Sequence, residues 1–569
     1  MHRATSLSIQ LLTALALAGC GETTPTPPAP TPDLSNAVYD ESKVLEVSIE
    51  LPAADWDKLR YQMNAVDELV GANCQDGPIT SVYEYVSANV TVNGQTFSNV
   101  GVRKKGFLGS ASLSKPSIKI DFDQYVPNQA FSGVEKLTLN NAVQDVSTVK
   151  QCLAYQVFRE AGVAAPRCNL AHVTVNGKDL GIYVNVEGIG DPMLRRFFQD
   201  DTGNLYEGQL SDFRPGWMAT YEKKSNITDP DRSDLDAVTN ALTATDAELE
   251  AKLGAVLDLE HFYHYWAVES LIGSWDGYTN GHNNHLVYHD PTSGKMVFIP
   301  WGQDMTFDAS DPFSPSDRPQ SVSANGAVPH RLYEVPATRA KYIAAMKDVL
   351  ANAWKEDKLT ARADQMIAQM KPLVSAEQAA FIDTGYMSVR DFIMGRRAVV
   401  EKELAMSKDW PYPLSGSPCQ TTEGSVSGTF STTWGSTSQM NPFATGQGTM
   451  DFVAPLGAMP TAAAMVGSAA GLTTEGKMGV GPWVQLVAAF PDGKLRTLVL
   501  FVDTEVYKTG VDIPFDWQQG FGYFLDIVNP QTNDLAPLGG LIHGKIRFDA
   551  AGTKDGEPVS GTFTGEFAK

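Results

Sequence analysis

The stretch "SWDGYTNGHNNHLVYHDPTSGKMVFIPWGQDMTF", residues 274–307, combines two apolar runs with polar side chains that stand at their ends. The segments "HLVYHD" and "MVFIP" read as two strands joined by the turn "PTSGK", and Pro300 ends the second strand. Asp304 follows directly, in a setting that would otherwise be core. A charge placed there must be hydrogen-bonded, paired or bound to a cation.

Asp276, Asn284 and Asp304 each lie at the end of a predicted element. Asp276 follows an aromatic, amphipathic helix within residues 257–275, Asn284 closes the next loop, and Asp304 follows the strand pair. Two carboxylates and an amide can converge on one cation, and oxygen ligands suit Mg²⁺ or Ca²⁺ rather than zinc. Taken one at a time, each residue also fits a structural role, as an Asx turn, a strand-start cap or a lysine's partner.

A second group of polar residues is basic. Five cations lie within seventeen residues, namely Arg103, Lys104, Lys105, Lys115 and Lys119. In a chain of net charge −22 this concentration indicates an anionic phosphate ligand, and the alternative is a solvated basic face. The strand-like alternation around Lys119 directs its side chain away from its apolar neighbours, either to solvent or into a cleft.

The rest of the chain is predicted to be strand-rich, then helical, then strand-rich again. Residues 81–106 and 169–189 read as hairpins that turn at Asn-Gly pairs, and a helix is predicted over residues 147–161. Residues 335–407 have helical periodicity, whereas residues 421–569 carry only short apolar strands. The pattern predicts an α+β fold followed by a β-sandwich-like domain that we expect to fold alone.

Length and charge restrict the class of protein. The chain has 569 residues, too many for a single core, so two or three domains are expected. A hydrophobic content of 43% and a charged content of 19% are typical of a globular protein. The net charge of −22 argues against nucleic acid as a partner, because phosphate backbones require a basic footprint.

The N-terminus has the form of an export signal. A short basic start precedes an apolar run that ends in Leu-Ala-Gly-Cys at residues 17–20, too short to span a bilayer. Small residues before a cysteine resemble the bacterial lipobox, so we expect Cys20 to be lipidated and residues 1–19 to be removed; the alternative is an ordinary cleaved signal. Removal takes away Arg3 and no acid, which makes the charge −23. Residues 20–35 then form a Pro/Thr-rich tether to a bacterial membrane, at the outer membrane or cell surface.

Four cysteines remain if Cys20 carries lipid, an even number for an oxidising compartment. No CxxC pair occurs, which argues against a zinc site. Of the three possible pairings we favour Cys152–Cys168 with Cys74–Cys419, because Cys152 opens a predicted helix and Cys168 opens the strand that follows.

Five ordered motifs carry a family resemblance. They are "GVRKKGFLGSASLSKPSIKIDF", "LTLNNAVQDVSTVKQCLAYQVFREAGV", "VNGKDLGIYVNVEGI", the stretch 274–307 and "DFIMGRRAVVEKEL". Together, over about residues 44–407, they resemble the CotH kinase family, named for a spore-coat protein. The resemblance implies an atypical protein kinase with a two-lobed fold, a strand-rich N-lobe and a helical C-lobe, here over residues 36–414, with residues 415–569 as a β-rich accessory domain.

The resemblance also implies roles for individual residues. Asp276 is similar to the catalytic aspartate that takes the proton of the acceptor hydroxyl, while Asn284 and Asp304 are similar to the metal-binding pair that holds Mg²⁺ or Mn²⁺ on ATP. The resemblance further implies Lys119 as the lysine that contacts the phosphates, with Arg103 and Lys105 as alternates or helpers. It also implies the segment Tyr183 to Glu187 for the adenine and Glu160 as a partner for the lysine.

One position departs from the family pattern. The family has two acids in a Trp-Asp-x-Asp segment, and this chain reads Trp301-Gly302-Gln303-Asp304. The first acid is therefore replaced by glycine, which puts activity in question and leaves the fold untouched.

Two functions follow as hypotheses. The first is a membrane-anchored kinase that transfers phosphoryl from ATP to Ser or Thr of surface or exported proteins. The second is a catalytically weak, kinase-like binding or scaffold protein at the cell surface, favoured by Gly302 and by the scarcity of ATP outside the cytoplasm.

Overall fold

The computed structural model describes residues 33–64, 71, 73–310, 317–438, 441–453, 459, 461–473, 481–529 and 534–568. Cys20 and residues 20–32 of the predicted tether lie outside these residues, so the predicted lipidation stays a prediction. Among the helices that the structure describes, not one combines the length and the apolar character needed to cross a bilayer.

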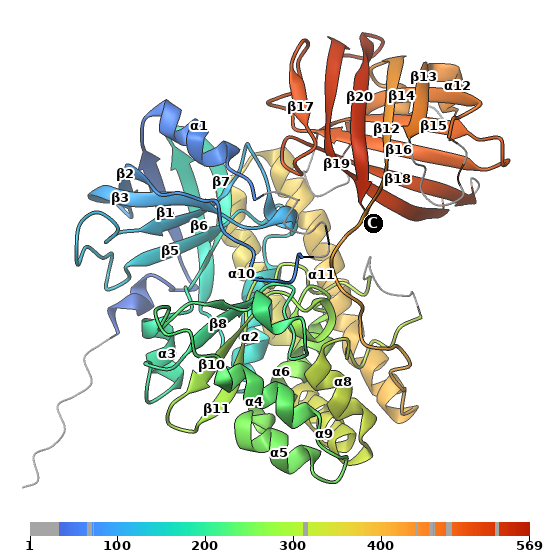
Figure 1. The fold of residues 1–569 in the computed structure, drawn as a ribbon. Helices are drawn as coiled ribbons and strands as arrows, with labels where there is room; N and C mark the ends of the chain where they lie inside the picture. Colours follow the sequence, from blue (N-terminus) through green and yellow to red (C-terminus); the bar gives the residue numbers. More distant parts are fainter. Residues whose placement is uncertain are drawn as a thin grey trace, which may run out of the picture.

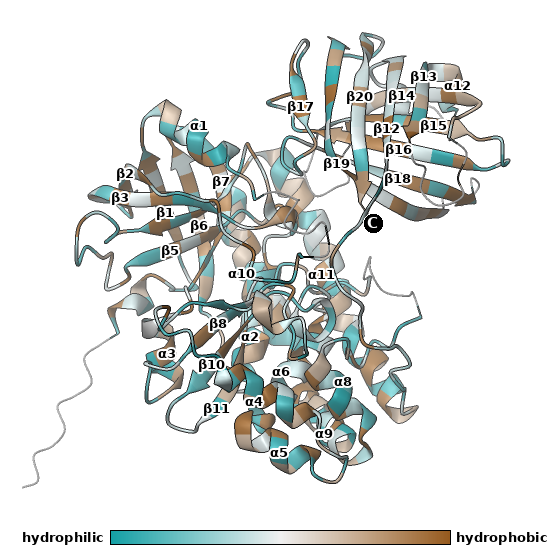
Figure 2. Cartoon of the chain, viewed as in Figure 1, coloured by the Kyte–Doolittle hydropathy of each residue, from teal (hydrophilic) through white to brown (hydrophobic). Residues whose placement is uncertain are grey.

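The first part of the chain forms a closed seven-stranded barrel, seen in blue and cyan in Figure 1. Its strands run in the order β1-β2-β3-β4-β5-β7-β6, and β6 closes the barrel by pairing parallel to β1. The bounds are β1 Val44–Glu50, β2 Val86–Val92, β3 Gln95–Lys105, β4 Ser117–Asp121, β5 Lys136–Asn140, β6 Cys168–Val175 and β7 Lys178–Val186. Alternating apolar side chains fill the interior, and Figure 2 shows hydrophobic and hydrophilic residues along the same strands.

Both predicted Asn-Gly turns are confirmed. Asn93 and Gly94 have φ of 49° and 82°, and Asn176 and Gly177 have φ of 50° and 74°. Two consecutive positive φ values are what a two-residue hairpin loop requires. The turns join β2 to β3 and β6 to β7.

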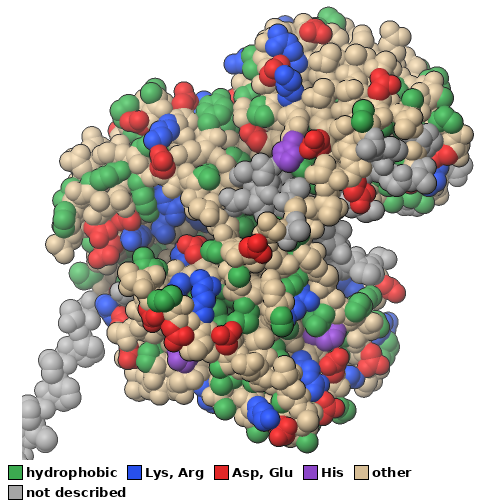
Figure 3. Space-filling model, in the orientation of Figure 1, with side chains coloured by type: hydrophobic (Ala, Val, Ile, Leu, Met, Phe, Trp, Pro, Cys, Tyr) green, Lys and Arg blue, Asp and Glu red, His purple; other side chains and the backbone are tan. Residues whose placement is uncertain are grey.

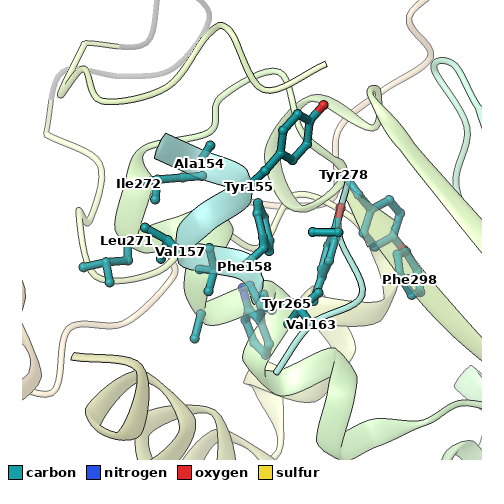
Figure 4. Packing of buried hydrophobic residues seen from close by; sticks show 14 of the residues in the cluster. Ala154, Tyr155, Val157, Phe158, Val163, Tyr265, Leu271, Ile272, Tyr278 and Phe298 are labelled. Carbon is teal, nitrogen blue, oxygen red and sulfur yellow. The ribbon is translucent and has the colours of Figure 1, made fainter. Parts of the chain in front are cut away.

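Two helices flank the barrel. Helix α1, Ala53–Tyr61, follows Pro52, and α2, Lys150–Glu160, lies within the predicted range 147–161 and is followed by Gly162 at φ 77°. Helix α2 contributes Tyr155 and Phe158 to the largest apolar core, where the ring of Phe158 packs against Tyr265 of helix α6, Leu259–Ile272 (Figure 4).

The second region combines a small sheet with most of the helices. The sheet has the order β11-β10-β8-β9, from β8 Leu205–Gly208, β9 Glu222–Lys223, β10 His285–Asp290 and β11 Lys295–Pro300. The helices are α3 Asp191–Phe197, α4 Ser233–Leu242, α5 Leu249–Val256, α6 Leu259–Ile272, α7 Tyr278–Gly281, α8 Ala327–Glu334, α9 Pro336–Asn352, α10 Glu356–Met370 and α11 Ala376–Ala405. The predicted strand pair and the predicted helical segment 335–407 are thus confirmed.

The C-terminal segment forms one sheet of nine strands, drawn in orange and red beside the barrel in Figure 1, which we call the C-terminal sheet. Its strands are β12 Thr422–Thr433, β13 Gln447–Val453, β14 Met465–Thr473, β15 Gly481–Ala489, β16 Leu495–Val502, β17 Asp512–Pro514, β18 Gly520–Asn529, β19 Asp534–Ala551 and β20 Pro558–Ala568. Its helix α12, Pro442–Thr445, is a single turn. The α+β class is confirmed, whereas the two-lobed and sandwich-like descriptions stay predictions, as do the domain boundaries.

Both disulfides of the favoured pairing are present. Cys152 at the start of α2 bonds Cys168 at the start of β6, and Cys74 bonds Cys419 across 345 residues of sequence. The second bond ties the segment before β2 to the segment that enters the C-terminal sheet.

Candidate functional site

The loop that carries Asp276 is held by the helix before it. Helix α6 ends at Gly273, whose φ of 67° turns the chain out of the helix. Glu269, on the last turns of α6, accepts hydrogen bonds from the backbone N–H groups of Tyr278 at 3.1 Å and Thr279 at 2.8 Å. Burial raises the pKa of Glu269 to about 7. The loop 274–277 is therefore fixed at both ends.

Asp276 and Asn284 are brought together, as the sequence predicted. The side-chain amide of Asn284 donates to Asp276 Oδ2 at 2.7 Å, and the amide of Asn283 donates to Oδ1 at 3.1 Å. Asn284 has a positive φ of 48°, a conformation that asparagine tolerates better than most residues. Two neighbouring amides thus orient one carboxylate.

The loop that carries Asp304 is joined to this first loop. The N–H of Trp301 donates to the carbonyl of Asn284 at 3.1 Å, and that of Phe307 donates to the carbonyl of Ile272 at 2.7 Å. The hydroxyl of Ser274 also donates to Gln303 Oε1 at 3.1 Å. These three bonds place the segment 301–307 beside the segment 272–284.

Gly302 lies at the closest approach of the two loops. Its φ is 53°, and a Cβ at this position would lie 2.4 Å from Asn284 Oδ1. A side chain here requires both a strained backbone and a displaced Asn284. In this chain the side chain of Asn284 occupies the space that a side chain at position 302 would enter.

Nearby charges of both signs influence the pKa of the Asp304 carboxyl group. Burial raises its pKa above the usual value, and the nearby charge of Asp145 adds to this, while the charge of Lys105 and a hydrogen bond from Gln151 act in the opposite direction. Asp145 precedes α2 and accepts from the N–H of Lys150 at 2.8 Å. Asp304, which follows β11, is thus influenced by Lys105 of the barrel, by Asp145 before α2 and by Gln151 of α2.

Lys105 is the barrel cation that faces Asp304. Its ammonium donates to Asn140 Oδ1, at the end of β5, and lies 5.6 Å from the ring centre of Trp301. Burial lowers its pKa to about 8, although the charges of Asp304 and Glu207 oppose the decrease. Lys105, an alternate in the sequence analysis, is therefore the lysine brought to the predicted acid.

Lys119 and Arg103 lie beside each other in a wider basic group. They are paired residues on the neighbouring strands β4 and β3. Burial lowers the pKa of Lys119 to about 8, and the positive charges of Arg103, Lys224 and Lys136 lower it further. Figure 3 shows Lys and Arg side chains gathered where the barrel meets the second region, with acidic side chains next to them.

The other two predicted cations serve the fold. The ammonium of Lys115 donates to the carbonyl of Ile182 at 2.8 Å. Lys104, on the opposite face of β3 from its neighbours, donates to the carbonyls of Arg60 at 3.0 Å and Gln62 at 2.7 Å. Alternation along the strand separates Lys104 from Lys105.

Two side-chain amides, those of Asn140 and Gln151, connect Lys105 to Asp304, and the sequence analysis did not predict them. Asn140 accepts from Lys105 and donates to Gln151 Oε1 at 2.8 Å, and Gln151 in turn hydrogen-bonds Asp304. Glu160, predicted to pair with the lysine, is instead at the far end of α2, where it accepts from Gln156. Asn284 was singled out as an amide at the boundary of a strand, and the same signal at the end of β5 would also have found Asn140.

Glu187, predicted to contact a cofactor, is hydrogen-bonded to two arginines. It accepts from Arg167 at 2.7 Å and from Arg196 at 2.6 Å. Burial would raise its pKa, but the hydrogen bonds of Arg196 and Arg167 lower it overall. Tyr183, at the start of the same segment, donates to the carbonyl of Pro116 at 3.0 Å. A role for this segment in binding adenine stays a prediction.

The oxygen atoms of Asp304 and Asn284 fit a hard divalent cation. A cation there would relieve the cost of a partly buried carboxylate whose pKa is raised first by burial and then by the neighbouring charge of Asp145. Within the described ranges, no three His, Cys, Asp or Glu side chains form a metal-binding group, so the candidate set is carboxylate and amide.

Comparison with known proteins identifies the family of this chain. Residues 102–400, more than half of the chain, match the family described as CotH kinase protein. The chain is 24% identical over 206 residues to the inner spore coat protein H of Bacillus subtilis and 25% identical over 244 residues to the invasin CotH3 of Rhizopus delemar. These matches cover 34% and 38% of this chain, and 55% and 40% of the relatives' own lengths.

A solved structure described as a Helicobacter pylori proinflammatory kinase, CtkA, aligns with 58% of this chain and 98% of its own, with a TM-score of 0.26 and 10% identity. The family match spans both loops of the site, the barrel strands that bring the basic residues and the helices that support them. The chain belongs to the CotH kinase family.

Proposed function

We propose that this protein is an exported, lipid-anchored protein kinase that transfers the γ-phosphoryl group of ATP to Ser or Thr of surface or exported proteins. One observation carries the proposal: Lys105 of the barrel lies over the ring of Trp301, three residues before Asp304, and its charge acts on that acid, with Asp276 and Asn284 in the adjoining loop. Cations opposite oxygen ligands are what a nucleotide triphosphate and its metal require.

The basic residues would bind and orient the phosphates. Lys105 lies nearest to the acid, and Lys119 and Arg103 extend the positive surface along β3 and β4. Their burial strengthens the attraction for an anion, because few water molecules screen it. The pKa values of Lys105 and Lys119, which burial lowers to about 8, would rise when a negatively charged phosphate binds.

Asp276 would act as the base. The acceptor hydroxyl oxygen attacks the γ-phosphorus, the bond to the β–γ bridging oxygen breaks, ADP leaves, and Asp276 takes the hydroxyl proton. The amides of Asn283 and Asn284 donate to the two carboxylate oxygens and hold the carboxylate in one orientation. Asp304 and Asn284 would hold Mg²⁺ or Mn²⁺, which neutralises phosphate charge when bound.

The proposed location and the proposed protein substrates depend on the N-terminal export signal, residues 1–19, and on Cys20. The basic start, the short apolar run and Cys20 support export and anchoring to a bacterial membrane. A kinase held there by a tether meets proteins outside the cytoplasm, so its acceptors would be Ser or Thr residues of surface or exported proteins.

The test uses residues 36–569 with labelled ATP and Mg²⁺ or Mn²⁺, assaying both nucleotide binding and label on the protein and on a generic Ser/Thr acceptor. The variants are Asp304→Asn and Lys105→Met. Asp308→Asn is the matched control, because this acid four residues further along is exposed and accepts hydrogen bonds from the neighbouring Ser310.

We expect transfer that Asp304→Asn and Lys105→Met abolish and Asp308→Asn leaves intact. Absence of any Asp304-dependent label refutes the kinase proposal. Nucleotide binding that depends on Asp304 without transfer would establish the second function instead, a kinase-like binding protein.

A further inference from the structure

The loop between β3 and β4 is anchored in the C-terminal sheet. This loop, residues 106–116, joins the strand that ends in Lys105 to the strand that carries Lys119. Leu113, in the middle of the loop, is 0% exposed and belongs to the same apolar cluster as the interior of the C-terminal sheet, including Val426, Leu500 and Phe563. A barrel loop thus supplies a core residue to another part of the chain.

The other side of the loop is held at the candidate site. The amide of Asn141 donates to the carbonyls of Ser110 at 2.9 Å and Lys115 at 2.7 Å, and its N–H donates to Ser117 Oγ at 3.0 Å. Asn141 follows Asn140, the residue to which Lys105 donates. The loop is therefore held between the site and the C-terminal sheet.

Strand β3 itself also contacts the sheet. The buried ammonium of Lys104, adjacent to Lys105, donates to Gln518 Oε1 in the loop before β18. Nearby, Arg60 at the end of α1 and Lys178 on β7 both pair with Glu505 of the C-terminal segment. The C-terminal segment thus contacts β3, β7 and helix α1 through polar side chains.

A covalent bond and two hydrogen bonds fix the approach of the sheet. Besides Cys74–Cys419, the N–H of Gly71 donates to the carbonyl of Gln420 at 2.9 Å, and Ser417 donates to Gln75 at 2.8 Å. The segment that enters β12 is thereby held against the barrel rather than left as a free linker.

We propose that the C-terminal sheet acts in cis as the positioning element of the nucleotide site, with Leu113 as the positioning residue that sets Lys105 and Lys119 against Asp304. The inference rests on the proposed function and assigns a role to residues 415–569. Leu113 lies eight residues after Lys105 and six before Lys119, so its anchor limits the motion of both strand ends at once.

The experiment compares Leu113→Ala and Gln518→Ala with the wild type, in residues 36–569. Leu113→Ala removes the anchor in the apolar cluster, and Gln518→Ala removes the contact of Lys104 from the sheet side without changing a residue of that cluster. Leu472→Ala is the matched control, because this leucine of the same sheet is 52% exposed. The readouts are the Kd of a fluorescent ATP analogue with Mg²⁺, the KM and kcat of transfer, and amide hydrogen exchange of residues 106–119 without nucleotide.

We expect Leu113→Ala and Gln518→Ala to raise Kd and KM about tenfold or more, as small misplacements of binding groups do, with a much smaller change in kcat. Exchange of residues 106–119 should become faster in both, and Leu472→Ala should match the wild type.

Each other outcome overturns a distinct statement. Wild-type affinity in both variants overturns the inference and leaves the kinase proposal standing. Faster exchange with unchanged affinity also overturns it, because the sheet would then hold the loop without positioning the site. A wild type that binds no nucleotide refutes the proposed function itself, and with it the site that the sheet would position.

Discussion

Replacing Gly302 with alanine tests how closely the two loops of the site are packed. Alanine would have to keep a φ of 53°, and the left-handed region costs a residue with a Cβ about 1–2 kcal/mol. Its Cβ would also lie 2.4 Å from Asn284 Oδ1, so the amide has to move. The 2.7 Å hydrogen bond from Asn284 to Asp276 is then lost, and a bond to a charged group contributes about 1.5–3 kcal/mol.

The sum predicts that Gly302→Ala lowers the free energy of unfolding by about 2.5–5 kcal/mol. Gly294→Ala is the matched control. Gly294 lies in the turn between β10 and β11, with φ 66° and no atom within 4 Å of a Cβ, so it should cost only the strain of about 1–2 kcal/mol. In an Asn284→Ala background, Gly302→Ala should also cost only this strain, because the obstacle is gone.

Urea denaturation of residues 36–569, followed by circular dichroism, measures these differences. Nucleotide binding by the same variants shows whether the loops carry the site. Equal losses for Gly302→Ala and Gly294→Ala would refute the packing argument. The argument also predicts that Gly302→Asp, which restores the family's acid, lowers stability and does not raise activity.

Three further perturbations have defined outcomes. Because burial raises the pKa of Glu269 to about 7, the folded protein holds this proton more tightly than the unfolded chain, so stability should fall by about 3 kcal/mol as pH rises from 4.5 to 7. Glu269→Gln should flatten that profile in pH-dependent denaturation, and an unchanged slope would contradict the assignment. The double variant C74S/C419S removes the bond between residues 345 positions apart and should lower the free energy of unfolding by about 2–4 kcal/mol, the usual contribution of a disulfide; an unchanged urea midpoint would count against it. Cys20→Ser should release the protein from the membrane fraction, and a variant that still sediments with membranes would disprove lipidation at Cys20.

Local elements were predictable because their signals are local. The Asn-Gly turns, the helix that ends at Gly273 and the strand pair before Asp304 follow from backbone preferences and from apolar periodicity over a few residues. The same reasoning placed Asp276 and Asn284 at the ends of elements, and they are hydrogen-bonded to each other. The closing of the barrel by the parallel pair β1 and β6 was not predictable, because more than a hundred residues separate these strands.

By itself, the sequence determined the elements, the α+β class and the residue types that carry the chemistry, since each depends on neighbours along the chain. Tertiary structure alone decided which partner each of them meets. Period-two alternation says that Lys104 and Lys105 point to opposite faces, but not that one reaches Gln518 and the other Asn140 beside Asp304. Those partners come from segments far along the chain, and only the packing of the barrel, the second region and the C-terminal sheet brings them within reach.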